Sequence, residues 1–509
     1  MARGVLVGYG ALGVQVLYSF ASIPLALAYL SKAEFGMWSL ISTLGTYLML
    51  AEMGMTTAVI RHLFDCKDGK DPGKYGRFFA ASAIALGLVS IVVFLIGWVV
   101  AWVSAPLFRI PPDLHHEYFW VMLGQTGLLA VTMATRMLGA PLYVHHRQDL
   151  SQINLIVLFT IYYFALRYGF QAGWGIYAML ANQVLGVIWV VGFNVVACFR
   201  LGFYPARKDW GLPLKEEWAS VWRYSRDLFV IQVGGMVLMS LPQLLVARLL
   251  GLEAAAAWAV CTRPFAILRQ FVTRPFDVAF PMLCDTFVRG DMKTVTKRWG
   301  EISQLVLALS GTAFAVAAVN NARFVSLWTA GRVHWDDSNH WLFGLYSYVY
   351  AAATLAFGSV GLTKSIGSTR FVSLAQALVT AALAVPMSKL WGFTGLMFAA
   401  TLPFTFGMIH FGIRYLASIT GSSYGPLALT GIIRPSMALP IAVLAAWTCA
   451  HLSRMVPGYY GLVVSSATGC VLALAAMMFV GVSSQVREEI RSMASRSLKR
   501  ILPGPRAEA

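Results

Sequence analysis

The sequence has 509 residues, of which 58% are hydrophobic and only 12% are charged, and its formal net charge is +17. A soluble domain carries about 25% charged residues, so this composition excludes an ordinary soluble globular protein. The sequence contains no P-loop, which argues against nucleotide hydrolysis by the chain itself.

Apolar segments of about 20 residues, the length that crosses a bilayer as a helix, recur along the whole chain. We predict about fourteen transmembrane helices, at residues 5–30, 36–60, 78–103, 118–144, 152–169, 173–199, 225–250, 254–284, 301–322, 341–363, 371–388, 392–413, 431–451 and 458–482. These segments leave no room for a soluble domain. The sequence therefore predicts an all-α polytopic membrane protein.

Lys and Arg fall mainly in alternate gaps between these segments. One side includes the N-terminus, the gaps 61–77, 200–226 and 285–299, and the C-terminal tail. It holds about 27 of the 39 Lys and Arg, and the other side holds about 7. Because basic loops stay in the cytoplasm, we expect both termini there. The same loops attract anionic membrane lipids, so the net charge does not indicate nucleic acid.

The second half of the chain repeats part of the first. Four residues recur at offsets of about 217 to 220, pairing Gln15 with Gln232, Pro24 with Pro242, Leu30 with Leu250, and Trp38 with Trp258. We predict two six-helix lobes, residues 1–216 and 217–430, then two additional transmembrane helices at 431–482 and a basic cytoplasmic tail at 483–509. Parallel repeats of this kind are a transporter architecture, with the substrate path between the halves.

The segment 254–284 concentrates charge where a membrane span should be apolar. Arg263, Arg269 and Arg274 lie within it, and Asp277 follows one turn later. Thr-Arg-Pro-Phe occurs twice, eleven residues apart, which at about 3.6 residues per turn puts Arg263 and Arg274 on one helix face. Prolines should bend or break this helix. Since charges inside a membrane are costly, we predict that these arginines line a water-filled cavity that holds an anionic substrate.

Two further charged residues are candidates for the same cavity. Arg136 lies in the fourth predicted span and could bind the substrate or extend to the membrane boundary. Glu52 lies in the second span, where it could couple transport to an ion, pair with an arginine as a gate, or simply pack and cap. We predict coupling or gating for Glu52 and Asp277.

Other candidate chemistry is sparse. The six cysteines are scattered and form no C-x-x-C pair. His334, Asp336, Asp337 and His340 have the residue types of metal ligands without a metal-binding spacing, so we interpret them as part of a surface loop. We therefore expect no metal and no cofactor.

The N-terminal sequence resembles the opening of polysaccharide flippases of the multidrug/oligosaccharidyl-lipid/polysaccharide exporter superfamily. The resemblance rests on Pro24, on Tyr29 and Leu30, on the run E-F-G-M-W at residues 34–38, and on E-M-G-M at residues 52–55. Many members carry Asp where Glu52 stands. The run from residue 281 to residue 291 also fits this family. Two spans beyond twelve occur in part of the superfamily, notably in lipid II flippases.

This resemblance implies a protein that moves polyprenyl-pyrophosphate-linked oligosaccharide across the bacterial cytoplasmic (inner) membrane by alternating access. Arginine forks suit phosphate oxygens, and an uphill step would need a proton or sodium gradient. Two alternatives stay open at this point. One is a multidrug or small-molecule antiporter of the same fold, and the other is a polytopic membrane enzyme such as a glycan polymerase or ligase.

Overall fold

The computed structural model is helical throughout the residues that it describes. These are residues 2–52, 72–145, 147–206, 209–211, 240–363, 369–489 and 491–492, together with residues 56, 63, 215 and 233. No strand occurs in this part of the chain. The predicted inner gap 61–77, the start of the predicted span 225–250 and most of the tail 483–509 lie outside the described residues. The fold class predicted from composition and hydropathy is confirmed.

The helices follow one another with short connections. In the first half they are α1 (Ala2–Tyr29), α2 (Lys32–Leu48), η1 (Met49–Glu52), α4 (Pro72–Leu107), α5 (His115–Thr135), η3 (Arg136–Gly139), α6 (Ala140–Val144), α7 (Gln148–Gln171), α8 (Tyr177–Arg200) and α10 (Leu252–Cys261). In the second half they are α11 (Arg263–Val272), α12 (Arg274–Val288), α13 (Met292–Trp328), α14 (Asp337–Gly358), α15 (Thr369–Pro403), α16 (His410–Thr420), α17 (Tyr424–Ala428), α18 (Arg434–Leu452) and α19 (Gly458–Ala476).

Ten helical stretches among the described residues are long and apolar enough to cross a membrane. One of them, Leu374–Thr420, has 47 residues and contains a break where Trp391 and Gly392 leave helical geometry, Gly392 with φ of 55°. This stretch accounts for two of the predicted spans. Three others escape the length criterion because α2 has 17 residues, the helix Ser240–Leu250 is short, and the eighth predicted span is divided.

Contacts divide the chain into two compact units. Unit 1 comprises residues 1–260 and 373–378, and unit 2 comprises residues 261–372 and 379–509. The division falls later in the chain than the boundary predicted between residues 216 and 217. Two lobes with the same fold stay a prediction.

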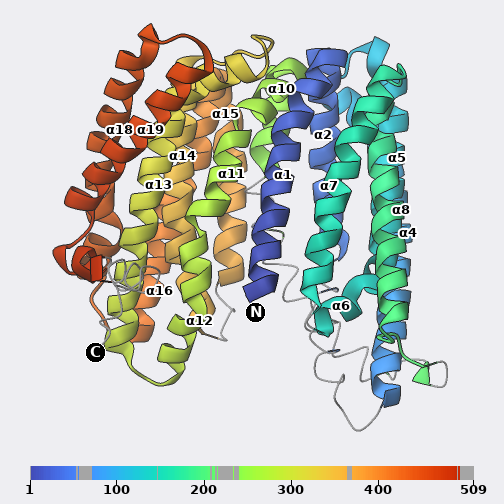
Figure 1. Cartoon of the computed structure of the whole chain (residues 1–509), viewed down its shortest axis with the longest axis horizontal. Coiled ribbons are helices and arrows are strands. Elements are labelled where there is room, and N and C mark those ends of the chain that lie inside the picture. The colour runs from blue at the N-terminus through green and yellow to red at the C-terminus, as the bar shows by residue number, and fades with distance from the viewer. Residues whose placement is uncertain are drawn as a thin grey trace, which may run out of the picture. The chain divides into compact units, whose positions relative to one another are not determined.

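Unit 1 is built on two helix pairs, α1 with α7 and α4 with α5 (Figure 1). Where α1 ends, the ring of Tyr29 stacks on Phe170 of α7 at 5.3 Å. The helix Ser240–Leu250 is attached to α2 by a hydrogen bond of 2.9 Å that Gln243 donates to Ser39 Oγ. Gln243 is buried, and in a membrane such side-chain hydrogen bonds join helices that have no hydrophobic force to hold them together.

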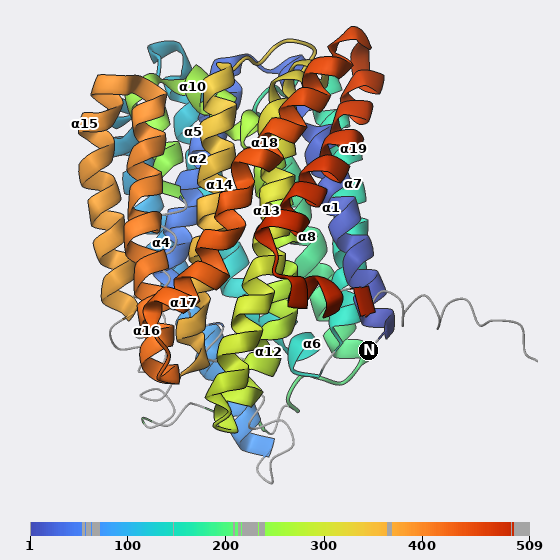
Figure 2. The ribbon, with the colours of Figure 1, turned by 90° about the vertical axis from the view of Figure 1, so that its left-hand side faces the viewer.

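Unit 2 is organised around α13, a helix of 37 residues that packs against α12, α14, α18 and α19 (Figure 2). Its contact with the two additional helices is made largely of alanine. Ala438, Ala442 and Ala446 follow at intervals of four on α18 and are fully buried, as is Ala473 of α19. Small residues let membrane helices approach closely, so that backbone and side-chain packing replaces the absent hydrophobic driving force.

Polar contacts attach the additional helices along the whole length of α13. Ser465 of α19 donates to Asn320 Oδ1 at 2.7 Å. Arg323, near the end of α13, donates to backbone carbonyls in the turn between α18 and α19, those of Ser453, Val456 and Gly458. At the other end of α13, Arg298 pairs with Glu489 at 2.7 Å. The additional helices are therefore an integral part of unit 2.

Candidate functional site

The repeated Thr-Arg-Pro-Phe sequence produces the same local structure twice. Thr262 precedes α11 and Thr273 precedes α12, with φ and ψ of −86° and −12° at the first and −84° and −15° at the second. In each case the proline follows the arginine, and it removes one backbone N–H from the helical ladder. The predicted breaks at Pro264 and Pro275 are confirmed, whereas Pro281 lies within α12 without dividing it.

Each repeat exposes its arginine and buries its phenylalanine. Arg263 and Arg274 are the first residues of α11 and α12, and both are exposed. Phe265 is fully buried against Phe343, with ring centroids 5.2 Å apart, and Phe276 is 7% exposed. The buried rings fix the two helix segments, and the guanidinium groups project from the same place in each repeat.

Arg269 lies between these two positions, in the last turn of α11, and is partly buried. Its guanidinium carbon lies over the ring of Tyr350, 5.1 Å from the centroid. The Tyr350 ring in turn packs edge-on against Phe404 at 5.3 Å. A guanidinium over an aromatic face is stabilised by the ring quadrupole, and this contact leaves the N–H groups at the edge of the guanidinium plane available for an anion.

Asp277 occupies the first turn of α12 and is exposed. A carboxylate is favourable at a helix N-terminus because it interacts with the helix macrodipole. Its side chain has no hydrogen bond or ion pair with the other residues that the structure describes. The predicted coupling or gating role of Asp277 gains no support from its surroundings and stays a prediction.

In unit 1, Glu52 and Arg136 form an ion pair that joins η1 to the start of η3. Glu52 is 7% exposed, and its second carboxylate oxygen accepts the backbone N–H of Thr56 at 3.2 Å. Removing one partner of a buried pair is strongly destabilising because it leaves an uncompensated charge. The pair therefore holds Arg136 in place as long as Glu52 is ionised.

Arg136 also lines a cavity of about 370 Å³ within unit 1. The cavity lies between the end of α5, α7 and α8, and its polar lining includes Tyr162, Gln183 and Asn194. No carboxylate is among the residues that line it. Arg136 thus connects a buried acid on one side with an open, polar space on the other.

The structure brings the predicted residues together in two groups, one in each unit. Glu52 and Arg136 are paired in unit 1, and the three arginines of α11 and α12 follow one another in unit 2 with Asp277. A single cavity wall containing all of them stays a prediction.

A buried polar group near the first helix break was missed in the sequence. Asn321 of α13 donates from Nδ2 to the backbone carbonyl of Cys261 at 2.8 Å, and the same nitrogen lies 2.8 Å from His340 Nδ1. His340 is 1% exposed, so its interpretation as part of a surface loop is wrong. It lies in the first turn of α14, where Trp335 packs edge-on against its ring at 5.3 Å. Asn and His in the middle of apolar sequence could have indicated this group.

Comparison with known proteins places the chain among membrane transporters by fold. The sequence pattern of a family described as "Polysaccharide biosynthesis protein" matches residues 1–287, which is more than half of the chain. No curated protein matches the sequence.

Several solved structures share the fold at low sequence identity. An inward-facing multidrug resistance MATE family transporter of the MOP superfamily has a TM-score of 0.69 at 8% identity, covering 82% of this chain and 99% of its own. The lipid II flippase MurJ, inward closed, has a TM-score of 0.63 at 11% identity, covering 94% and 98%. A MOP superfamily transporter from Pyrococcus furiosus, whose binding pocket has reversed polarity, has a TM-score of 0.52 at 10% identity, covering 82% and 95%.

Proposed function

The chain belongs to the family of polysaccharide biosynthesis proteins, and we propose that it moves polyprenyl-pyrophosphate-linked oligosaccharide across the bacterial cytoplasmic membrane. The observation that carries this proposal is the placement of the arginines at helix breaks. Arg136, Arg263 and Arg274 each begin a helix segment that follows directly on another. Discontinuous helices form the substrate sites of many transporters, with half-helix N-termini directed at anionic groups.

A pyrophosphate is a suitable partner for this arrangement. Guanidinium groups bind phosphate oxygens through two parallel hydrogen bonds, and Arg is more effective than Lys at such sites. The arginines would hold the pyrophosphate while the glycan crosses in water and the polyprenyl chain stays in the lipid. Alternating access of two lobes would then carry the head group from the inner to the outer leaflet.

Glu52 supplies a means of coupling this movement to an ion gradient. While ionised, it neutralises Arg136 and keeps that guanidinium from an anionic substrate. A proton or a sodium ion arriving at the carboxylate would weaken the pair and free Arg136 to bind pyrophosphate in the adjoining cavity. Loading of substrate and loading of the ion would therefore favour the same state, which is the requirement for coupled transport.

The fold alone would also suit a multidrug antiporter, since MATE transporters share it. A cationic drug, however, requires acidic or apolar walls, and repulsion by guanidinium groups disfavours it. The charge of the candidate residues therefore favours an anionic substrate.

The arginine pair of α11 tests the proposed function. We expect the double variant Arg263→Ala, Arg269→Ala to abolish surface glycan while its abundance in the membrane stays normal. The matched control is Arg289→Ala, which removes an exposed arginine paired with Asp285 just after α12. Normal glycan export by the double variant would overturn the cationic site. Loss of the protein from the membrane would instead assign the two arginines to folding.

The proposed location and orientation have their own test. Single cysteines replacing Lys70 or Trp210 should react with an impermeant maleimide only from the cytoplasmic side, and a cysteine replacing Asp336 only from the outside. The reverse pattern would overturn the proposal that both termini lie in the cytoplasm.

A further inference from the structure

A second polar pocket lies in unit 2, away from the arginines of α11 and α12 along the sequence. It is a cavity of about 170 Å³ between α13, α14 and α18. Since one water molecule takes about 30 Å³ of liquid volume, the cavity has room for roughly five waters. It can therefore hold a small polar head group but not an oligosaccharide.

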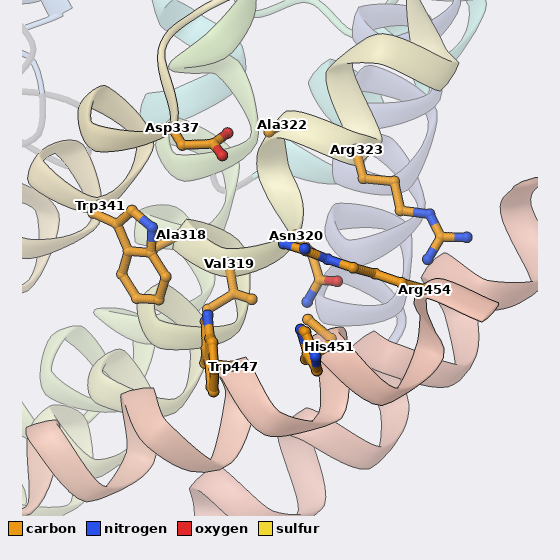
Figure 3. A pocket seen from close by; sticks show the side chains of 11 residues that line it. Ala318, Val319, Asn320, Ala322, Arg323, Asp337, Trp341, Trp447, His451 and Arg454 are labelled. Carbon is orange, nitrogen blue, oxygen red and sulfur yellow. The ribbon is translucent and has the colours of Figure 1, made fainter. Parts of the chain in front are cut away.

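The two sides of this pocket have opposite charge. Figure 3 shows Asp337 and Trp341 on one side, and Asn320 with His451 and Arg454 on the other. Arg454 extends back across the pocket towards Asn320 (Figure 3). Such a pocket fits a ligand that carries a negative group at one end and a hydrogen-bond donor at the other.

One cation in the pocket is committed and the other is available. Arg323 already donates to three carbonyl groups of the turn between α18 and α19. Arg454 has no hydrogen bond or ion pair within the described part of the chain, and the carboxylate of Asp337 has none either. An uncompensated guanidinium and an uncompensated carboxylate beside the same cavity indicate that ligand groups complete both interactions.

The surface around the pocket is apolar. Leu452 is 76% exposed and Met455 is 93% exposed, and both flank Arg454 in sequence. Trp447, one turn before His451, stacks on the His451 ring at 5.4 Å and is partly exposed in the manner of side chains at the membrane interface. A ligand in this pocket would have hydrocarbon next to it, as the head group of a lipid does.

We propose that this pocket binds a phospholipid head group that has both a phosphate and its own hydrogen-bond donor, as phosphoethanolamine and phosphoglycerol have. Arg454 and His451 bind the phosphate, Asp337 accepts from the ammonium or hydroxyl group, and the acyl chains lie along α18. The site is separate from the proposed cargo, and bound lipid would hold α18 to α13 and α14.

Native mass spectrometry of the delipidated full-length protein tests this site. We expect one copy of phosphatidylethanolamine or phosphatidylglycerol to bind about tenfold more tightly than phosphatidylcholine, whose quaternary ammonium cannot donate a hydrogen bond. Arg454→Gln should lower the affinity for phosphatidylethanolamine about tenfold. Asp337→Asn should abolish the preference over phosphatidylcholine while leaving phosphatidylcholine binding unchanged. The control Arg434→Gln, at the opposite end of α18, should change neither.

The competing outcomes are distinct. Equal binding of phosphatidylethanolamine and phosphatidylcholine to the unchanged protein, or unchanged binding by Arg454→Gln, would overturn the site. Soluble phosphoethanolamine competing as well as the whole lipid would show that the ligand is a free phosphate ester, which also overturns a lipid site. A melting temperature equal to that of the unchanged protein confirms that each variant is folded.

Discussion

The two units hold their key arginines by different physical means. In unit 1 a buried carboxylate binds Arg136 directly, so that arginine becomes available only when the charge of Glu52 is removed. In unit 2 the ring of Tyr350 supports Arg269 from one face, 5.1 Å from the guanidinium carbon, and its charge remains uncompensated. The difference teaches that one arginine can be switched by an ion, whereas the other is permanently ready for an anion.

The largest effect should come from unit 2. Arg269→Ala removes a charge-assisted bidentate contact of about 1.5–3 kcal/mol, so we expect substrate flipping by reconstituted protein to fall roughly 10- to 100-fold. Arg269→Lys keeps the charge but loses the planar fork and should restore activity only in part. Arg289→Ala should be normal. If Arg269→Ala flips substrate at the normal rate, the comparison fails on the side of unit 2.

The next effect concerns the switch in unit 1. Glu52→Gln removes the charge that holds Arg136, so we expect tighter substrate binding together with transport that no longer responds to an imposed ion gradient. Measuring uptake into proteoliposomes with a proton gradient and, separately, with a sodium gradient identifies the ion. The control Glu253→Gln changes an exposed carboxylate of α10 and should leave the response intact. A gradient response that survives in Glu52→Gln would exclude this residue as the coupling group.

A double-mutant cycle sharpens the same point. Because Glu52 and Arg136 contact each other, the effects of Glu52→Gln and Arg136→Gln on transport should not add. We expect a coupling energy of about 1–3 kcal/mol. Additive effects would mean that the pair is structurally present but does not act as a unit in transport.

The smallest effect belongs to the aromatic support. Tyr350→Phe keeps the ring face under Arg269 and should be close to normal. Tyr350→Leu removes the cation–π contact, worth about 0.5–2 kcal/mol, and should reduce flipping a few-fold. Equal activity of the two variants, at equal membrane abundance, would show that the ring does not position the guanidinium.

The sequence predicts the helices well because hydropathy and proline act locally. The divided span 254–284 follows from its two Arg-Pro steps, and the break at Gly392 separates two spans predicted from their apolar composition alone. Pairing across space is a different matter. Glu52 and Arg136 are 84 residues apart, and nothing in the sequence around either one selects the other.

The same limitation explains the error at His340. Its neighbours Asp336 and Asp337 are polar, so the local composition resembles a loop, yet Asn321 of another helix supplies a hydrogen-bonding partner that makes burial affordable. The support of Arg269 by Tyr350 is equally invisible, because aromatic residues in membrane spans are common and have no periodic signature. Burial of polar groups is decided by partners distant in the chain, whereas span formation is decided by the span itself.

The attachment of α18 and α19 to α13 has a consequence for synthesis of the protein. Asn320 lies 145 residues before Ser465, and Arg298 lies 191 residues before Glu489. At about 5–20 residues per second, the partners of α13 emerge from the ribosome roughly 10 to 40 seconds after α13 itself. During that interval its polar groups and its alanine face have no permanent neighbours. The order of translation therefore makes α13 the part of the chain that most needs protection by the insertion machinery.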